Sequence, residues 1–123
     1  AFKKLSDKVK AVARVRGYVK GLDGRVIWIR NEHASLNSLL QGAGAIVMKK
    51  ALVLLDKHLK DAGFKYKFVA NIHDEWQMEV PKETADLIGN IGVRAIREAG
   101  EHYKLRCPLD GEYKYGRNWS ETH

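Results

Sequence analysis

The chain has 123 residues, of which 45% are hydrophobic, and this length allows one modest core. Its 22 Lys and Arg outnumber 15 Asp and Glu, and the net charge of +7 favours a polyanionic partner, although a solvated lysine face would look the same. The single Cys107 excludes an internal disulfide, no uninterrupted apolar run reaches the roughly 18 residues of a membrane span, and no signal peptide precedes the first helix. We therefore expect a soluble, cytoplasmic chain, and its start without methionine favours processing or excision from a longer one.

The first predicted element is an amphipathic helix that ends at Gly17. Its apolar residues recur at spacings of three and four with lysines between them: Phe2, Leu5, Val9 and Val12. Residues 1–30 hold nine basic side chains against two acidic ones, so this end of the chain is expected to lie along phosphates.

A two-stranded ribbon is predicted next. The β-formers at 18–20 and 25–29 flank Gly21-Leu22-Asp23-Gly24, and Asp-Gly between β-formers is a strong hairpin signal.

A long helix is predicted over about 34–62, because this stretch lacks proline and Gly63 stands where a helix-ending glycine belongs. Polar side chains follow a spacing of four along one face: His33, Asn37, Gln41 and Lys49, with Ala45 interrupting the row. Asn and Gln both donate and accept hydrogen bonds, so the row could contact acceptors at a duplex end; an ordinary solvated face is the alternative.

Gly42 and Gly44 stand inside this helix, where each costs about 0.8–1 kcal/mol relative to alanine. Such a pair suggests the close approach of a ligand or another backbone, and tight helix packing explains it equally well.

A second hairpin is predicted over about 66–80. Period-two alternation places Phe68, Ala70 and Ile72 on one face of the first strand and makes Trp76, Met78 and Val80 apolar on the second. A helix from Pro81 to about Tyr103 and a short β-like segment near 112–115 follow, and then an irregular tail.

The connection of this hairpin consists of charged residues, His73-Asp74-Glu75. Adjacent carboxylates on a rigid tip suit Mg²⁺, which takes hard oxygen ligands and keeps its remaining positions for water or phosphate. Polar residues also populate turns for conformational reasons alone.

Three segments in this order resemble family A DNA polymerases over nearly the whole chain: 37–45 (Asn-Ser-Leu-Leu-Gln-Gly-Ala-Gly-Ala), 69–75 (Val-Ala-Asn-Ile-His-Asp-Glu) and 116–119 (Gly-Arg-Asn-Trp). The replicative polymerases of short-tailed bacteriophages are the most similar members, since they share the ribbon at 21–25 and a histidine shortly after the Asn-Trp pair, like His123.

The resemblance implies that His73-Asp74-Glu75 is motif C, the catalytic group of the palm. Asp74 would bind the catalytic Mg²⁺ ions with support from Glu75, and His73 would lie by the primer terminus. Asn37 and Gln41 would lie against the minor groove of the primer-template, in a DNA-binding row with His33 and Lys49. His33 stands where bacterial members often have arginine, and Trp76 is expected only to pack.

For the fold we expect an α+β class: a long central helix packed on an antiparallel palm hairpin with flanking helices, residues 1–123 being the C-terminal segment of a polymerase domain from the palm and fingers base. The predicted core residues are Leu36, Leu40, Val47, Leu54, Ile72 and Met78. As part of a domain, the chain should expose apolar patches and be marginally stable or self-associate.

The family also needs a motif A aspartate and a fingers helix, and neither occurs in these residues. The resemblance therefore implies a DNA-directed DNA polymerase part that is inactive alone, with a two-metal Mg²⁺ site completed by residues outside this chain. Its partners would be primer-template DNA, deoxynucleoside triphosphates and the N-terminal part of the enzyme, with no membrane, in the host cytoplasm if phage-encoded. The alternatives are a non-catalytic DNA-binding accessory module and a structural protein that keeps an old polymerase shape.

Overall fold

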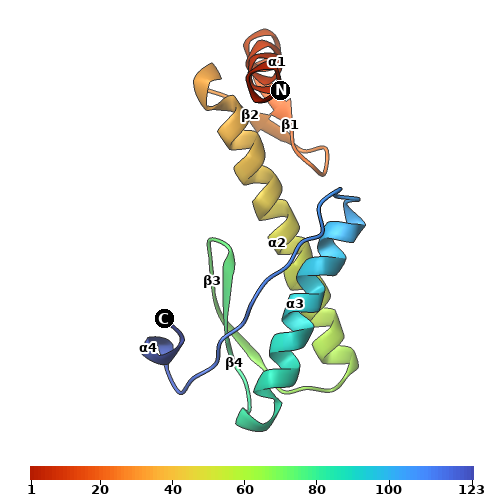
Figure 1. Cartoon of the computed structure of the whole chain (residues 1–123), viewed down its shortest axis with the longest axis vertical. Coiled ribbons are helices and arrows are strands. Elements are labelled where there is room, and N and C mark those ends of the chain that lie inside the picture. Colours follow the sequence, from red (N-terminus) through yellow and green to blue (C-terminus); the bar gives the residue numbers. More distant parts are fainter. The chain divides into compact units, whose positions relative to one another are not determined.

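The computed structural model describes all 123 residues, which form two compact units, Ala1–Ile46 (unit 1) and Val47–His123 (unit 2) (Figure 1). The long helix α2 (Ser35–Asp61) gives its first part to unit 1 and the remainder to unit 2. Helices alternate with two antiparallel two-stranded sheets, and the predicted α+β class is confirmed.

Unit 1 begins with α1 (Phe2–Arg16), which ends as predicted at Gly17. Gly17 has a φ of 73°, and its N–H donates to the Ala13 carbonyl at 2.8 Å, a left-handed cap that glycine adopts without steric cost. The predicted ribbon is also confirmed: β1 (Tyr18–Lys20) pairs with β2 (Val26–Trp28), with Tyr18 opposite Trp28.

The core of unit 1 lies where α1, the ribbon and the start of α2 meet. Its buried residues are Val9, Ala13, Val19 and Leu36, and Val12, Ile27, Ile29 and Leu39 pack around them. A Cβ atom at Gly42 would stand 3.0 Å from Cδ1 of Ile27, so helix packing against the ribbon accounts for this glycine.

A short 3-10 helix, η1 (Glu32–Ala34), leads into α2, where the fully buried Ser35 hydroxyl donates to the Glu32 carbonyl at 2.6 Å. At its other end, α2 ends before Gly63, which has a φ of 75°. The N–H of Phe64 donates to the Leu59 carbonyl at 3.0 Å, which completes a left-handed cap. The predicted bounds of 34–62 are right to one residue at each end.

The stretch Glu32–Asp61 is long enough to cross a membrane and contains an 18-residue window with a mean hydropathy of 1.5, so it passes a test of length and composition alone. The expectation from the sequence concerned apolar runs, and polar residues such as Gln41, Lys49 and Lys50 do interrupt this stretch; its many Leu, Ile and Val residues nevertheless give the window a high mean. A single helix of this kind is weak evidence for a membrane span, since core helices pass the same test.

Unit 2 contains the predicted second hairpin, formed by β3 (Lys67–Ile72) and β4 (Glu75–Glu79). A bulge between Phe68 and Ala70 interrupts the ladder, so Phe68 lies opposite Met78 while Asn71 lies opposite Trp76. Trp76 and Met78 both pack against the buried residues of α2 and α3, which fits the packing role expected of Trp76.

Two predicted core residues are wrong. Ile72 is 42% exposed, because the bulge places it opposite Glu75, on the other face of the hairpin from Trp76 and Met78. Leu40 is 57% exposed because it lies beside Asn37 and Gln41 on the outer face of α2. Leu36 and Val47 are buried as predicted, and Leu54 and Met78 are half-buried.

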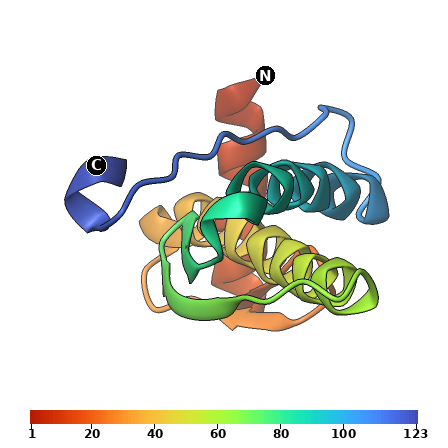
Figure 2. The same ribbon diagram turned by 90° about the horizontal axis from the view of Figure 1, so that it is seen from below.

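Helix α3 (Ala85–His102) follows a 3-10 turn, η2 (Lys82–Thr84), so the predicted helix from Pro81 begins with a tighter turn. Figures 1 and 2 show α3 running beside the second half of α2. Between the two helices, His58 contacts Glu98 at 2.7 Å. The buried residues on this contact are Val47, Ala51, Leu55, Leu59, Ile88, Ala95 and Ala99.

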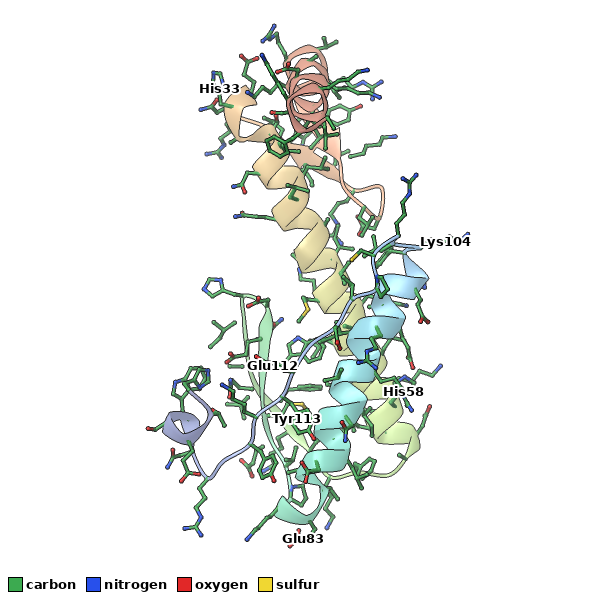
Figure 3. The ribbon with its side chains drawn as sticks, viewed as in Figure 1. His33, His58, Glu83, Lys104, Glu112 and Tyr113 are labelled. Carbon is green, nitrogen blue, oxygen red and sulfur yellow. The ribbon has the colours of Figure 1, made fainter.

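The C-terminal segment returns from α3 toward the hairpin without forming a strand (Figure 1). The β-like segment predicted near 112–115 is therefore wrong: Tyr113 packs on Gly89 of α3, and its hydroxyl donates to Asp86 at 3.1 Å (Figure 3). The segment pairs with no strand, since each sheet contains only its own two strands. The chain ends with one turn of helix, α4 (Trp119–Thr122).

Candidate functional site

The β3–β4 connection consists of His73 and Asp74, because β3 ends at Ile72 and β4 begins at Glu75. His73 has a φ of 54°, a left-handed conformation that is uncommon for a residue other than glycine. Two-residue hairpin turns require a positive φ at their first position, which explains the local geometry. The turn leaves the Asp74 side chain exposed at the tip of a packed hairpin.

Asp74 and Glu75 differ in their surroundings. The Asp74 carboxylate makes no hydrogen bond or ion pair within the chain, so its oxygens are open to a ligand. Glu75 is half-exposed and accepts hydrogen bonds from Nε2 of Gln77 and, at 2.8 Å, from Nε2 of His123. These two hydrogen bonds lower the pKa of the Glu75 carboxyl group and hold it ionised, and the bond from His123 has the larger effect.

His123 connects the end of the chain to this hairpin. Its ring stacks on Trp119 with centroids 3.9 Å apart and planes 7° from parallel, and Nδ1 lies 3.1 Å from the Trp119 carbonyl. The Trp119 carbonyl and then the Glu75 carboxylate raise the pKa of His123, since both are acceptors and favour the doubly protonated ring. In the sequence, His123 is notable only for the resemblance to phage polymerases, and no local pattern predicts a contact between residues 48 positions apart.

The hairpin tip offers hard oxygen donors that fit a divalent cation such as Mg²⁺. No group of three or more His, Cys, Asp or Glu side chains converges anywhere in the chain. Two carboxylates do not complete a metal site, so a cation at this tip would need further ligands from elsewhere.

The predicted polar row is exposed along its whole length, at His33, Asn37, Gln41, Ala45 and Lys49. His33 lies in η1 (Figure 3), where its N–H donates to Oδ1 of Asn31 at 3.0 Å. The side-chain amides of Asn37 and Gln41 make no hydrogen bond within the chain, so their donors and acceptors are free. The first three polar residues of the row belong to unit 1 and Lys49 to unit 2.

Gly44 lies on the same helix face as Asn37, seven residues away, and is exposed. A Cβ atom there would meet nothing within 4 Å. Packing within the chain therefore explains Gly42 but not Gly44.

The family model for DNA polymerase family A matches residues 1–121, and the chain belongs to this family. It is 40% identical over 115 residues to the DNA-directed DNA polymerase of Enterobacteria phage T3 and 37% identical over 115 residues to that of Escherichia phage T7. Each alignment covers 88% of this chain and 16% of the phage protein. DNA polymerase I of Aquifex aeolicus strain VF5 is 32% identical over 123 residues, which cover 98% of this chain and 21% of the relative.

Among solved structures, the POL domain of Pol1 from M. smegmatis, in complex with DNA primer-template and dNTP, superposes with a TM-score of 0.84 at 27% identity. The match covers 98% of this chain and 23% of that one. The predicted resemblance to phage-like family A polymerases is confirmed, and the chain spans about a sixth of the length of the phage relatives.

Proposed function

We propose that this chain is the C-terminal part of a DNA-directed DNA polymerase that acts in DNA replication, and that its β3–β4 hairpin is motif C. The observation that carries the proposal is the tip of that hairpin. In a chain matched by the family model over residues 1–121, a two-residue turn presents one carboxylate that nothing in the chain engages, Asp74. An acidic turn kept only for its conformation would more often use its carboxylate to cap its own backbone.

In this proposal Asp74 is the metal ligand and Glu75 is held in place behind it. Hydrogen bonds from Gln77 and His123 fix the Glu75 carboxylate in its ionised form, which strengthens the negative potential at the tip. His73, the first residue of the same turn, would lie beside the primer terminus. Bound Mg²⁺ would supply activation of the primer 3′-hydroxyl and charge neutralisation on the triphosphate.

The polar row on α2 is proposed to bind the primer-template. Asn37 and Gln41 have free amide groups, which suit the minor-groove acceptors that all base pairs share, so they would sense pairing without reading sequence. His33 would extend this contact within unit 1, and Lys49, in unit 2, would contribute a cation to DNA binding.

The proposed partners are primer-template DNA, deoxynucleoside triphosphates and the remaining part of the polymerase. A two-metal phosphoryl transfer needs carboxylates that converge from separate segments, and this chain contributes one segment. We therefore propose that the chain alone is inactive. We propose an intracellular location on the basis of the phage and bacterial relatives, and we attribute the apolar content of α2 to the buried residues that it supplies to both units.

The test is primer extension with Mg²⁺ and all four nucleotides, using the chain alone and mixed with the N-terminal remainder of its polymerase. Extension only in the mixture is expected. Incorporation by the chain alone would contradict the incomplete site, and failure of a mixture that visibly associates would contradict the polymerase role.

A DNA-binding accessory module remains the second candidate, and the charge distribution favours it as well. Residues 1–46 hold nine Lys and Arg against three Asp and Glu, whereas residues 47–123 are nearly balanced. Such a module would bind DNA in the mixture without any dependence of extension on Asp74.

A further inference from the structure

Unit 1 contains a pocket that none of the proposed roles uses. It lies between β2 and the start of α2, has a volume of about 270 Å³, and is lined by Trp28, Ile29, Arg30, Asn31, Ala34 and Ser38. Pockets for drug-sized ligands occupy about 300–1,000 Å³, so this one suits a single planar group.

Trp28 is the largest side chain of the pocket, and it is 74% exposed. Its ring makes an edge-to-face contact with the ring of Tyr18 on the paired strand, with ring centroids 5.6 Å apart and ring planes at 71°. This contact restrains the indole while leaving most of its surface in water. An exposed, restrained aromatic ring is the feature on which nucleobases stack in proteins that bind single strands.

The polar residues around Trp28 can contact the phosphate and the base edge of a nucleotide. The exposed Arg30 guanidinium makes no ion pair or hydrogen bond within the chain, and neither does the Ser38 hydroxyl. Arg30 can thus contact a phosphate, and Ser38 can donate to or accept from a base edge. The excess of six positive charges in residues 1–46 would draw a polyanion to this pocket rather than an apolar peptide.

We propose that the pocket at Trp28 binds an unpaired base of a single DNA strand, with the base stacked on the indole and the adjoining phosphate on Arg30. The choice of DNA as ligand rests on the proposed function, but the stacking site shares no residue with the hairpin tip or with the polar row of α2. The site would bind a single-stranded segment of DNA whose bases are not paired.

The test compares the affinity of the full chain for a short oligothymidylate and for the same backbone with abasic residues. Trp28→Ala and Trp28→Leu should each weaken oligothymidylate binding about tenfold, within the range measured for base–aromatic stacking, because leucine keeps apolar bulk but offers no flat ring. Trp28→Phe should retain most of the affinity. Phe2→Ala is the matched control, since Phe2 is an equally exposed aromatic residue of unit 1, 72% exposed, that does not line the pocket.

None of these variants should change binding of the abasic strand. Three outcomes would overturn the proposal. The Trp28 substitutions could weaken binding of both strands equally, they could leave the affinity for oligothymidylate unchanged, or the chain could show no measurable binding of oligothymidylate. An absent effect would indicate that a protein surface covers Trp28. All three outcomes leave the primer-extension test of the proposed function untouched, because that test depends on Asp74.

Photocross-linking identifies directly which peptide of the chain contacts the DNA base. An oligonucleotide carrying 5-iodouracil is expected to attach to the tryptic peptide of residues 26–30, in which Trp28 is the one aromatic residue. Attachment only to peptides of unit 2 would overturn the site even if affinity depends on Trp28.

Discussion

Tyr66 shows how a single contact changes the chemistry of a side chain. Its hydroxyl donates to Oδ1 of Asp56 at 2.5 Å, and burial together with this carboxylate raises the pKa of Tyr66 from 10.0 to about 12. The hydrogen bond also lowers the pKa of Asp56. It therefore links the end of α2 to the residue that precedes β3.

The raised pKa of Tyr66 predicts a loss of stability in alkali. The folded-state pKa lies above the unfolded one, so the contribution is complete below pH 10 and is lost as the pH rises toward about 12. An absorbance titration of the phenolates should show one tyrosine ionising last, and Tyr66→Phe should remove that step. If Tyr66→Phe instead removed the ionisation of a tyrosine with a pKa near 10.0, the hydrogen bond between Tyr66 and Asp56 would be contradicted.

Lys104 is the residue with the least suitable backbone for its type. It lies two residues after the end of α3 with a φ of 54°, in the position that Gly63 occupies after α2. A left-handed conformation costs an L-residue about 1–2 kcal/mol, and glycine loses about 0.4–1 kcal/mol more in the unfolded chain, so Lys104→Gly should stabilise by about 0.5–1 kcal/mol.

Urea denaturation measures this change. Lys65→Gly is the control, because Lys65 is an exposed loop lysine without a positive φ, and it should gain nothing. Equal shifts in both variants would mean that the cap conformation is not the cause.

At the scale of elements, α2 carries two glycines with different surroundings. Gly44→Ala should stabilise the chain by about 0.8–1 kcal/mol, because the added methyl group meets no atom within 4 Å. Gly42→Ala should gain less, since its methyl group would stand 3.0 Å from Ile27 and the ribbon must shift. Thermal denaturation of both variants tests this, and a larger gain at Gly42 would contradict the packing.

The elements predicted best are those with local causes. Gly17 and Gly63 end helices because of their own conformational freedom, and Asp23-Gly24 specifies its turn, so α1, the ribbon and α2 were predicted nearly to the residue. Hairpin faces were predicted less well, because the bulge after Phe68 reverses the alternation and exposes Ile72. No pattern in this sequence predicts such a bulge.

The candidate site divides in the same way. The acidic tip at Asp74 was predicted because polar residues between β-formers are visible in the sequence, and the structure places it at a two-residue turn. The bond between His123 and Glu75 was not predicted, and the reason is that it depends on the path of the C-terminal segment along α3.

At the scale of the molecule, both units expose large apolar side chains, as expected for part of a domain. On the hairpin these are Phe68, Val69 and Ile72, and β3 is an edge strand with 67% of Val69 exposed. Exposed apolar edge strands promote association. We therefore predict concentration-dependent self-association in sedimentation velocity, weakened by Val69→Lys.

Val15→Lys is the control for that experiment, because Val15 is 85% exposed but lies on a helix, away from any strand edge. A monomer at all concentrations, or equal effects of the two lysines, would exclude the edge strand as the cause.

The central claim is that Asp74 is a ligand of the catalytic metal in a polymerase assembled from this chain and other segments. The most direct measurement replaces the matching segment of the phage T3 polymerase with this chain and follows single-nucleotide incorporation with Mg²⁺. Asp74→Asn should lower the rate by about a thousandfold, equivalent to several kcal/mol of transition-state stabilisation, while Asp61→Asn, an exposed and unpaired carboxylate on α2, should leave it unchanged. Equal rates for the two variants in a chimaera that binds DNA would contradict the claim.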